Sequence, residues 1–260
     1  MGELSATRLR GLLEDQEIGR DIQVFREVVS TNEMLSQIAA EGARHGTAVV
    51  ADAQIAGRGR LGRSWSSPPG TNIYTSVLLR GFDAATAPLA VYLAGVAVAE
   101  AMERLADIAP FVKWPNDVHA RGKKLAGILC ESVPGAADHG VIIGIGWNVN
   151  ALLNDFPREI RDTATSLHLL TGRRFDRALV LAELYRHLER RYNEFRADRR
   201  IVLERWKTLA RIGDVRYRVG VDGRVVDGTA TDLAPDGALV LTCPGGERAV
   251  IHSGDVLAYE

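Results

Sequence analysis

The stretch GRGRLGR, residues 57–63, places three glycines and three arginines in seven consecutive positions. Gly57, Gly59 and Gly62 satisfy the G-x-G-x-x-G spacing of dinucleotide-binding loops, but that motif needs a helix that opens at its third glycine. Gly62 is instead followed by RSWSSPPG, which has no helical pattern. The stretch therefore predicts a mobile loop that folds over an anion, with guanidinium and backbone N–H groups on phosphate or carboxylate oxygens.

Two further stretches place lysines beside apolar runs. KWPND, 113–117, sets Lys113 at a strand end and Asn116 and Asp117 after a proline-fixed turn, and GKKLAGIL, 122–129, sets Lys124 at the start of an apolar strand. A lysine at such a position is costly unless an anionic partner lies there, which favours a binding role for Lys124. For Lys113, an exposed charge at a strand end is an equally good explanation.

A third stretch, GIGWNVN at 144–150, combines small residues with a polar amide. Gly144 and Gly146 permit a ligand to approach a strand closely, and the amide of Asn148 both donates and accepts hydrogen bonds. The same residues also fit a close packing contact within a sheet. The stretch alone does not decide between the two.

Strands and helices are mixed along the chain without regular βαβ alternation, which favours an α+β fold. Ser30 and Glu33 form a capping-box pattern at the start of a helical stripe. Periodicity predicts further helices at 4–15, 87–102 and, as one or two amphipathic helices, 177–212; strands are predicted at 47–54, 72–80, 111–114, 124–133 and 140–149.

The chain changes character near residue 213. Short β-rich runs are separated by the turn signals VDG, PDG and PGG, which predicts a small appended β-barrel. We therefore expect two domains, a catalytic domain over 1–212 and a barrel over 213–260.

Composition excludes several classes of function. With 32 Lys and Arg against 33 Asp and Glu, a net charge of −1 does not suit a general polyanion binder. Cys130 and Cys243 form no CxxC pair, which fits structural thiols in a reducing cytosol. No secretory signal precedes the first helix, and the apolar stretch 87–102 is too short for a membrane span. These features predict a cytoplasmic protein without membrane attachment.

The motifs together resemble the biotin protein ligases. The resemblance rests on STN at 30–32, Gln54, GRGRLGRSWSSPPG, KWPND, KLAGIL, GIGWNVN and RDTATSL at 161–167, in matching order over nearly the whole chain. It implies a catalytic domain akin to class II aminoacyl-tRNA synthetases, followed by an SH3-like barrel. This agrees with the α+β class and with the boundary expected near residue 213.

The resemblance also implies a reaction in two steps. The biotin carboxylate attacks the α-phosphate of MgATP, which gives biotinyl-5′-AMP and pyrophosphate. A lysine amine of a biotin carboxyl carrier protein, such as that of acetyl-CoA carboxylase, then attacks the mixed anhydride and expels AMP. Both steps move negative charge, so positively charged side chains and the positioning of the reactants should contribute more to catalysis than a protein nucleophile.

By the same resemblance, each motif has a role. Lys124, Arg60 and Asp117 are the implied catalytic residues, with Asp117 also a candidate for Mg²⁺ or for positioning the incoming amine. The implied biotin contacts are Ser30, Thr31, Asn32, Gln54, Gly57, Arg58, Arg60, Lys124, Gly127, Gly144 and Gly146. The implied adenylate contacts are Arg58, Arg60, Arg63, Trp65, Lys113, Asn116, Lys124 and Asn148. Mg²⁺ is expected to be carried by the phosphates, which suits the lack of a clustered metal motif.

One departure from the family concerns DNA. Many bacterial members begin with a helix-turn-helix domain and act as repressors, whereas only about 22 residues precede the first core strand here. We therefore expect a ligase without DNA binding, either monomeric or dimeric. Two alternatives stay open: a lipoate or octanoate ligase, against which GRGRLGR and KWPND argue, and a biotin sensor that binds without catalysis.

Overall fold

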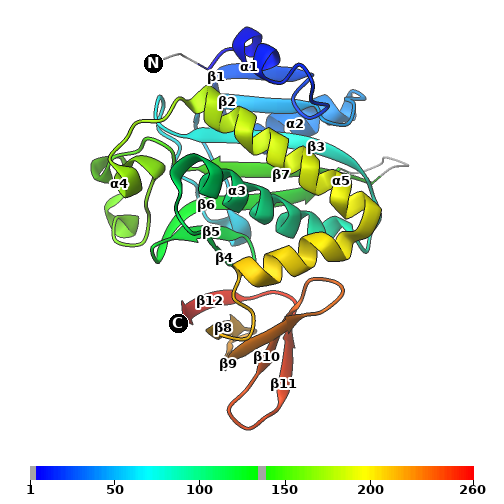
Figure 1. The fold of residues 1–260 in the computed structure, drawn as a ribbon, viewed down its shortest axis with the longest axis vertical. Helices are drawn as coiled ribbons and strands as arrows, with labels where there is room; N and C mark the ends of the chain where they lie inside the picture. Colours follow the sequence, from blue (N-terminus) through cyan, green and yellow to red (C-terminus); the bar gives the residue numbers. More distant parts are fainter. Residues whose placement is uncertain (1–3, 134–138) are drawn as a thin grey trace.

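A seven-stranded mixed sheet forms the centre of the molecule (Figure 1). The computed structural model describes residues 4–133 and 139–260. Strand order is β1-β2-β3-β7-β6-β5-β4; β1 and β2 pair in parallel and the other neighbours pair antiparallel. The strands are β1 (Ile22–Val28), β2 (Ala48–Gln54), β3 (Ile73–Phe82), β4 (Phe111–Lys113), β5 (Asp117–Ala120), β6 (Lys123–Ser132) and β7 (His139–Trp147).

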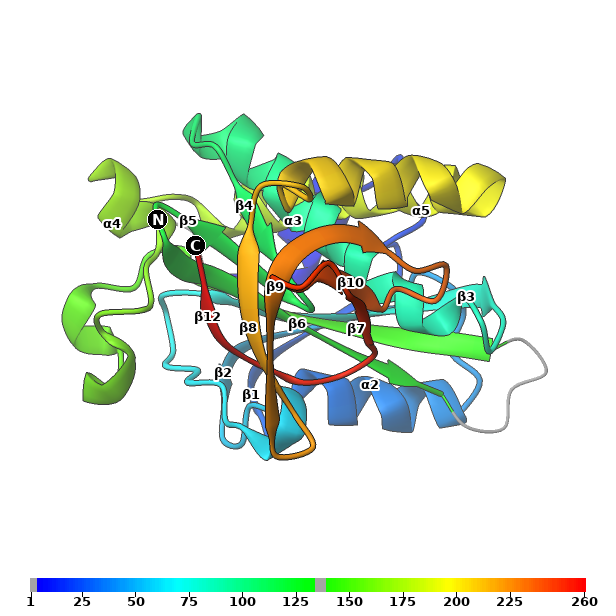
Figure 2. The same cartoon turned by 90° about the horizontal axis from the view of Figure 1, so that it is seen from below.

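Helices cover both faces of this sheet. Figure 2 shows α3 (Ala90–Ala106) and α5 (Arg177–Leu209) on one side and α2 (Thr31–Ala40) on the other. Successive strand residues alternate between the faces. Val49 and Leu78 therefore pack with Leu35 of α2, whereas Val50 and Val77 join the larger core under α3 and α5. The short helices α1 (Ala6–Leu12) and α4 (Leu167–Thr171) lie at the periphery.

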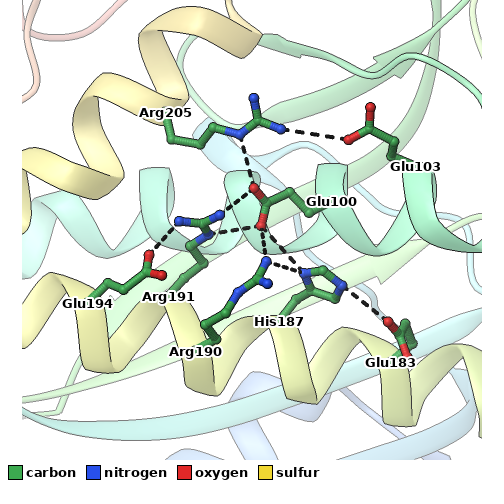
Figure 3. A network of polar contacts seen from close by, with 8 residues as sticks. All are labelled: Glu100, Glu103, Glu183, His187, Arg190, Arg191, Glu194 and Arg205. Atoms are coloured by element: carbon green, nitrogen blue, oxygen red, sulfur yellow. Dashed lines mark hydrogen bonds and ion pairs between the residues drawn. The ribbon is translucent and has the colours of Figure 1, made fainter.

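A buried carboxylate fastens α5 to α3 (Figure 3). Helix α5 is broken at Asp198, where φ is −155° and ψ is 104°. Glu100 of α3, only 7% exposed, accepts hydrogen bonds from Arg191 before the break and from Arg205 after it. Burial alone would raise the pKa of Glu100, but hydrogen bonds from His187, Arg191 and Arg205 lower it below its usual range. The contact holds both halves of α5 on the sheet and directs the second half toward the C-terminal domain.

A five-stranded antiparallel sheet follows α5, in the order β11-β10-β9-β8-β12. Its strands are β8 (Arg216–Val221), β9 (Arg224–Leu233), β10 (Leu239–Thr242), β11 (Arg248–Ile251) and β12 (Asp255–Tyr259). Trp114, 1% exposed, lies in one core cluster with Tyr217 of this sheet. The Tyr92 hydroxyl donates to the Gly237 carbonyl, and Trp114 Nε1 donates to Tyr92 Oη at 3.1 Å. The two sheets therefore share a continuous apolar contact.

The α+β fold class with a small C-terminal β domain is confirmed, and each predicted helix and strand has a counterpart. The boundary near residue 213 stays a prediction, placed between the end of α5 at Leu209 and the start of β8 at Arg216. One local prediction is wrong: Ser30 stands at the N-cap of α2, but its side chain makes no capping hydrogen bond. Among the residues described here, no helix is long and apolar enough to cross a membrane.

Candidate active site

A cleft of about 300 Å³ opens between the central sheet, the start of α2, the Gly-Arg loop and the first residues of β12. By the Gly-Arg loop we mean residues 57–65. Every site residue that the sequence predicted lines this cleft except Gly57. Gly57, the first residue of the loop, is buried instead, and a Cβ added to it would stand 2.8 Å from Ser67 Oγ and 2.9 Å from Gln54 Nε2.

Polar groups at the start of α2 form one end of the cleft. Thr31 N–H donates to Gln54 Oε1 at 2.9 Å, and Gln54 Nε2 donates to Ser67 Oγ at 2.9 Å. These two contacts fix both ends of the Gln54 amide. Ser30 and Thr31 are almost fully buried beside it, at 3% and 4% exposure. The result is a small, buried and polar pocket whose donors and acceptors are already oriented.

Asn32 is held at the bottom of that pocket. Ser76 Oγ donates to Asn32 Oδ1 at 2.6 Å, and Asn32 Nδ2 donates to Glu131 Oε2 at 2.6 Å. Gly144 on β7 lies directly under this side chain, and any Cβ added there would collide with Asn32 Oδ1. The glycine is thus required for packing against Asn32, which was one of the two explanations open for GIGWNVN.

Trp65 covers the middle of the cleft floor. An added Cβ on Gly127 would stand 2.9 Å from the indole, and one on Gly146 would collide with it. The two glycines face each other in the β6–β7 ladder and so form a flat surface that accepts the ring. The Lys124 Nζ lies 5.4 Å from the Trp65 ring centroid, within cation–π range. Trp65 therefore links the loop to the sheet that carries Lys124.

Lys124 forms an ion pair with Asp117, with Nζ 2.7 Å from Oδ1. The β5–β6 pairing brings them together, because Lys124 pairs with His119 and Asp117 pairs with Gly127 across a bulge. The segment 161–167 supports Lys124 from the other side, since the backbone N–H of Lys124 donates to the Thr163 carbonyl at 2.7 Å. Burial alone would raise the pKa of Asp117, but His119 and Lys124 lower it to about 2. The anionic partner expected for Lys124 is thus a carboxylate of the chain itself.

The Gly-Arg loop closes on itself as a narrow hairpin. Gly59 N–H donates to the Arg63 carbonyl at 2.7 Å, and Trp65 N–H donates to the Gly57 carbonyl at 2.8 Å. A single 3₁₀ turn, Arg60–Gly62, forms its tip, where Leu61 has a φ of 56°. The Gly-Arg loop thereby presents its three arginines to the cleft.

The three loop arginines are in different surroundings. Arg58 contacts Glu131, with Nη2 3.3 Å from Oε2, and Arg63 forms an ion pair with Asp255 at the start of β12. Arg60 is half-buried, and burial lowers the pKa of its guanidinium. Arg58 and Arg63 thus each hold a carboxylate oxygen that an anionic ligand would replace.

The remaining predicted residues support the cleft wall. Burial lowers the pKa of Lys113, whose Nζ stands 4.9 Å from the Tyr259 ring centroid in β12. Asn116 Nδ2 donates to the Ile128 carbonyl at 2.7 Å and so ties the KWPND turn to β6. Asn148, 4% exposed, accepts a hydrogen bond from Asn72.

Sequence reasoning missed several residues that organise the site. Glu131 follows Gly127 and Leu129 at strand spacing, so alternation along β6 would have placed it on the cleft face. Ser76 is a polar residue inside an apolar strand, a usable signal that such a side chain has a buried partner. Asp255 comes from the other domain, and no local pattern marks it.

Comparison with known proteins agrees with this architecture. Residues 24–148 match the biotin/lipoate A/B protein ligase family, and residues 216–258 match the biotin protein ligase C-terminal domain. The bifunctional ligase/repressor BirA of Bacillus subtilis is 35% identical over 98% of this chain and 79% of its own length. The biotin–[acetyl-CoA-carboxylase] ligase of Mycobacterium tuberculosis is 36% identical over 94% of this chain and 93% of its own.

Solved structures give the same result. The biotin protein ligase of Aquifex aeolicus, in complex with biotin and ATP, superposes with a TM-score of 0.78 and 31% identity, over 93% of this chain and 99% of that one. The fold and the cleft thus define a ligase of the biotin and lipoate class. The C-terminal match and the two relatives, which are aligned over nearly the whole chain, point to the biotin branch, so the chain belongs to the biotin protein ligase family.

Proposed function

We propose that this ligase joins biotin to a lysine of the biotin carboxyl carrier protein of acetyl-CoA carboxylase, or of a related biotin-dependent carboxylase, through biotinyl-5′-AMP. The observation that carries the proposal is the single cleft in which the polar pocket at α2, the Trp65-covered glycines and the Lys124–Asp117 pair meet. Two relatives support it: the Mycobacterium ligase named for acetyl-CoA carboxylase, and the Aquifex ligase that holds biotin and ATP.

The polar pocket suits the ureido ring of biotin. That ring offers one carbonyl acceptor and two N–H donors, and the pocket offers Ser30 and Thr31 hydroxyls together with the Asn32 and Gln54 amides. The apolar valeryl chain then passes Asn32 and the Trp65 indole, the two side chains that pack on Gly144 and Gly146. This direction brings the carboxylate of biotin toward Lys124.

Adenylation is an in-line displacement at phosphorus. A carboxylate oxygen of biotin bonds to the α-phosphorus of ATP, and the bond from that phosphorus to the pyrophosphate oxygen breaks. Lys124 turns from Asp117 to the carboxylate and phosphate oxygens, where charge is redistributed during attack. Arg58, Arg60 and Arg63 neutralise the phosphates, and Arg58 and Arg63 leave Glu131 and Asp255 to do so.

Magnesium supplies charge neutralisation on the triphosphate in such a reaction. Within residues 4–133 and 139–260, no three His, Cys, Asp or Glu side chains gather into a metal site. Asp117, proposed from the sequence as a ligand, is thus not part of a carboxylate cluster. The residues described would fit an ion held mainly by the phosphates.

Transfer then needs an amine held close to the mixed anhydride. The carrier lysine nitrogen bonds to the acyl carbon, the bond to the phosphate oxygen breaks, and AMP leaves. Asp117 lies on the cleft wall next to Lys124 and accepts a hydrogen bond from the incoming amine, which orients it for attack. No protein nucleophile is required in either step.

The experiment that tests this proposal measures mass. The protein is incubated with biotin, MgATP and a biotin carboxyl carrier domain, and the carrier is examined by intact mass spectrometry. We expect a biotin-sized increment that is absent when ATP is omitted. Lipoate in place of biotin is the matched control, because the matched family includes lipoate ligases. A lipoyl increment without a biotinyl one, or no increment with correctly folded proteins, would contradict the proposal. The Bacillus relative is named a bifunctional ligase/repressor, and for this chain we propose the ligase activity alone.

A further inference from the structure

His119 lies behind the Lys124–Asp117 pair and was not part of any sequence prediction. It is 6% exposed, on β5, two residues beyond Asp117. Its Nε2 stands 4.0 Å from Asp117 Oδ2 and is buried without a hydrogen-bond partner. A buried imidazole nitrogen without a partner is uncommon and calls for an explanation in terms of function or of another state of the site.

The other ring nitrogen is fixed from the C-terminal domain. Tyr259 Oη of β12 lies 2.9 Å from His119 Nδ1 and 3.4 Å from the Gly122 carbonyl. Which group donates in the 2.9 Å contact depends on the tautomer of the ring. Because Nε2 faces the Asp117 carboxylate, we infer the tautomer with the proton on Nε2, in which Nδ1 accepts from the Tyr259 hydroxyl. Phe111 stacks on Tyr259 with centroids 5.3 Å apart, which keeps the phenol in place.

The reaction proposed above explains why such a donor is needed. In this structure Lys124 supplies the counter-charge of Asp117. When Lys124 turns to the ligand, the Asp117 carboxylate, whose side chain is 17% exposed, stays behind without that ion pair. A buried carboxylate in that state is costly unless another donor replaces the lost contact. His119 Nε2 stands 4.0 Å from Asp117 Oδ2 and needs only about 1 Å of movement to reach hydrogen-bonding distance.

We propose that His119 is a positioning residue that holds the Asp117 carboxylate through Nε2–H once Lys124 contacts the adenylate, and that Tyr259 sets the tautomer that makes this possible. The inference rests on the proposed two-step ligase reaction. It assigns the C-terminal domain a chemical part in the transfer step, because the Tyr259 hydroxyl acts on Asp117 through one imidazole. Loss of this hydrogen bond should leave adenylation nearly unchanged and slow the attack of the carrier lysine.

Two amide variants separate the two ring nitrogens. In His119→Gln the side-chain amide reaches the position of Nε2 and still donates to Asp117, whereas in His119→Asn it reaches only that of Nδ1. Single-turnover rates are measured separately for adenylation and for transfer from preformed biotinyl-AMP to a carrier domain. We expect His119→Asn to slow transfer roughly tenfold, and His119→Gln to transfer near the parental rate. Equal transfer rates for the parent and His119→Asn would overturn the proposal.

A spectroscopic measurement tests the tautomer without relying on activity. Nitrogen-15 NMR of the imidazole in the full chain should show a proton on Nε2 and none on Nδ1, and Tyr259→Phe should add the Nδ1-protonated form. A parental ring protonated at Nδ1 would overturn the proposal, and this readout decides the matter if the His119 variants fail to fold. A parent that makes no biotinyl-AMP would instead contradict the proposed function, so the two failures are distinguishable.

Discussion

The Gly-Arg loop and the β5–β6 hairpin both bring positive charge to the cleft, but by different means. In the loop, the side chains of Arg58 and Arg63 are 46% and 64% exposed and hold exchangeable carboxylates on other elements. In the hairpin, Lys124 and Asp117 are 34% and 17% exposed, and the strand ladder sets their separation. The loop can change partners at little cost, whereas the hairpin cannot move without breaking the sheet.

This difference assigns the two regions to different tasks. Catalysis of charge movement needs groups that are fixed before the reaction, because reorganisation during the reaction adds to the barrier. Retention of a reactive intermediate needs a cover that opens and closes. The strands of the hairpin are fixed and only the Lys124 side chain turns, when the ligand binds and before the chemical step, so the hairpin fits the first requirement. The loop fits the second. Variants of each region should therefore affect different measurements.

The largest effect is expected in the hairpin. Lys124→Ala should lower the single-turnover rate of adenylation on the order of a hundredfold, with a much smaller change in biotin affinity. Its ammonium contacts charge that is redistributed during attack, so its loss falls mainly on the rate. Lys123→Ala, on the exposed neighbour, is the matched control and should adenylate normally. Adenylation by Lys124→Ala at the parental rate would contradict the role given to this lysine.

Part of the pH dependence of the free energy of unfolding should come from Asp117. The pKa of Asp117 falls from 3.8 to about 2 in the folded protein. The ionised carboxylate therefore stabilises folding above pH 3.8, and this contribution is lost as the pH falls through 2. It amounts to about 2 kcal/mol. Urea unfolding of the parent and of Asp117→Asn should differ at neutral pH and converge in acid. Parallel pH profiles would show that the pair does not stabilise the hairpin.

The junction between the two regions is the contact of Trp65 with Gly146. Gly146→Ala should weaken biotin binding roughly tenfold, because an added methyl group must displace the indole from the strand. Gly59→Ala is the matched control, since its φ is −116° and its added Cβ would stand 3.4 Å from the Arg63 carbonyl oxygen. Isothermal titration with biotin measures both. Equal affinities for the two variants would show that Trp65 does not need its flat support.

A smaller effect on rate, but a distinct one, is expected in the loop. Arg60→Gly should keep much of the adenylation activity while releasing biotinyl-AMP, so that lysines of an unrelated added protein become biotinylated. Limited proteolysis of the parent should cut near residues 57–63, and biotin with ATP should suppress the cut. Leu61→Gly tests added flexibility without loss of charge. A variant that leaks no more than the parent, with a loop equally resistant to protease with and without ligands, would exclude the Gly-Arg loop as a cover over the intermediate.

The smallest effect should come from the tie between the loop and β12. Arg63→Ala removes an exposed ion pair with Asp255, and such pairs contribute at most about 1 kcal/mol. A double-mutant cycle with Asp255→Ala, read by thermal unfolding, isolates this coupling. A coupling well above that value would mean that the C-terminal domain locks the loop instead of holding it loosely.

Much of the site could be predicted from the sequence because its signals are local. The spacing in GRGRLGR, KWPND and KLAGIL depends on neighbouring residues, and alternation or helical periodicity over a few residues was enough to find most of the strands and helices that carry them. The short strand β5, which carries Asp117, was not predicted. The α+β class followed from the order of those elements. The partner of Lys124 in this structure could not be predicted from the sequence, because strand pairing and a bulge bring Asp117 to it.

Tertiary structure alone decided which groups complete the site. Glu131 meets Asn32 because β6 lies beside β7 under α2, and Tyr259 meets His119 because the second sheet packs against β4 and β5. The partners in these contacts lie more than ninety residues apart in sequence. A local pattern records which side chains can do chemistry, whereas their charge partners are set by strand register and by the packing of two sheets, which no short stretch of the sequence contains.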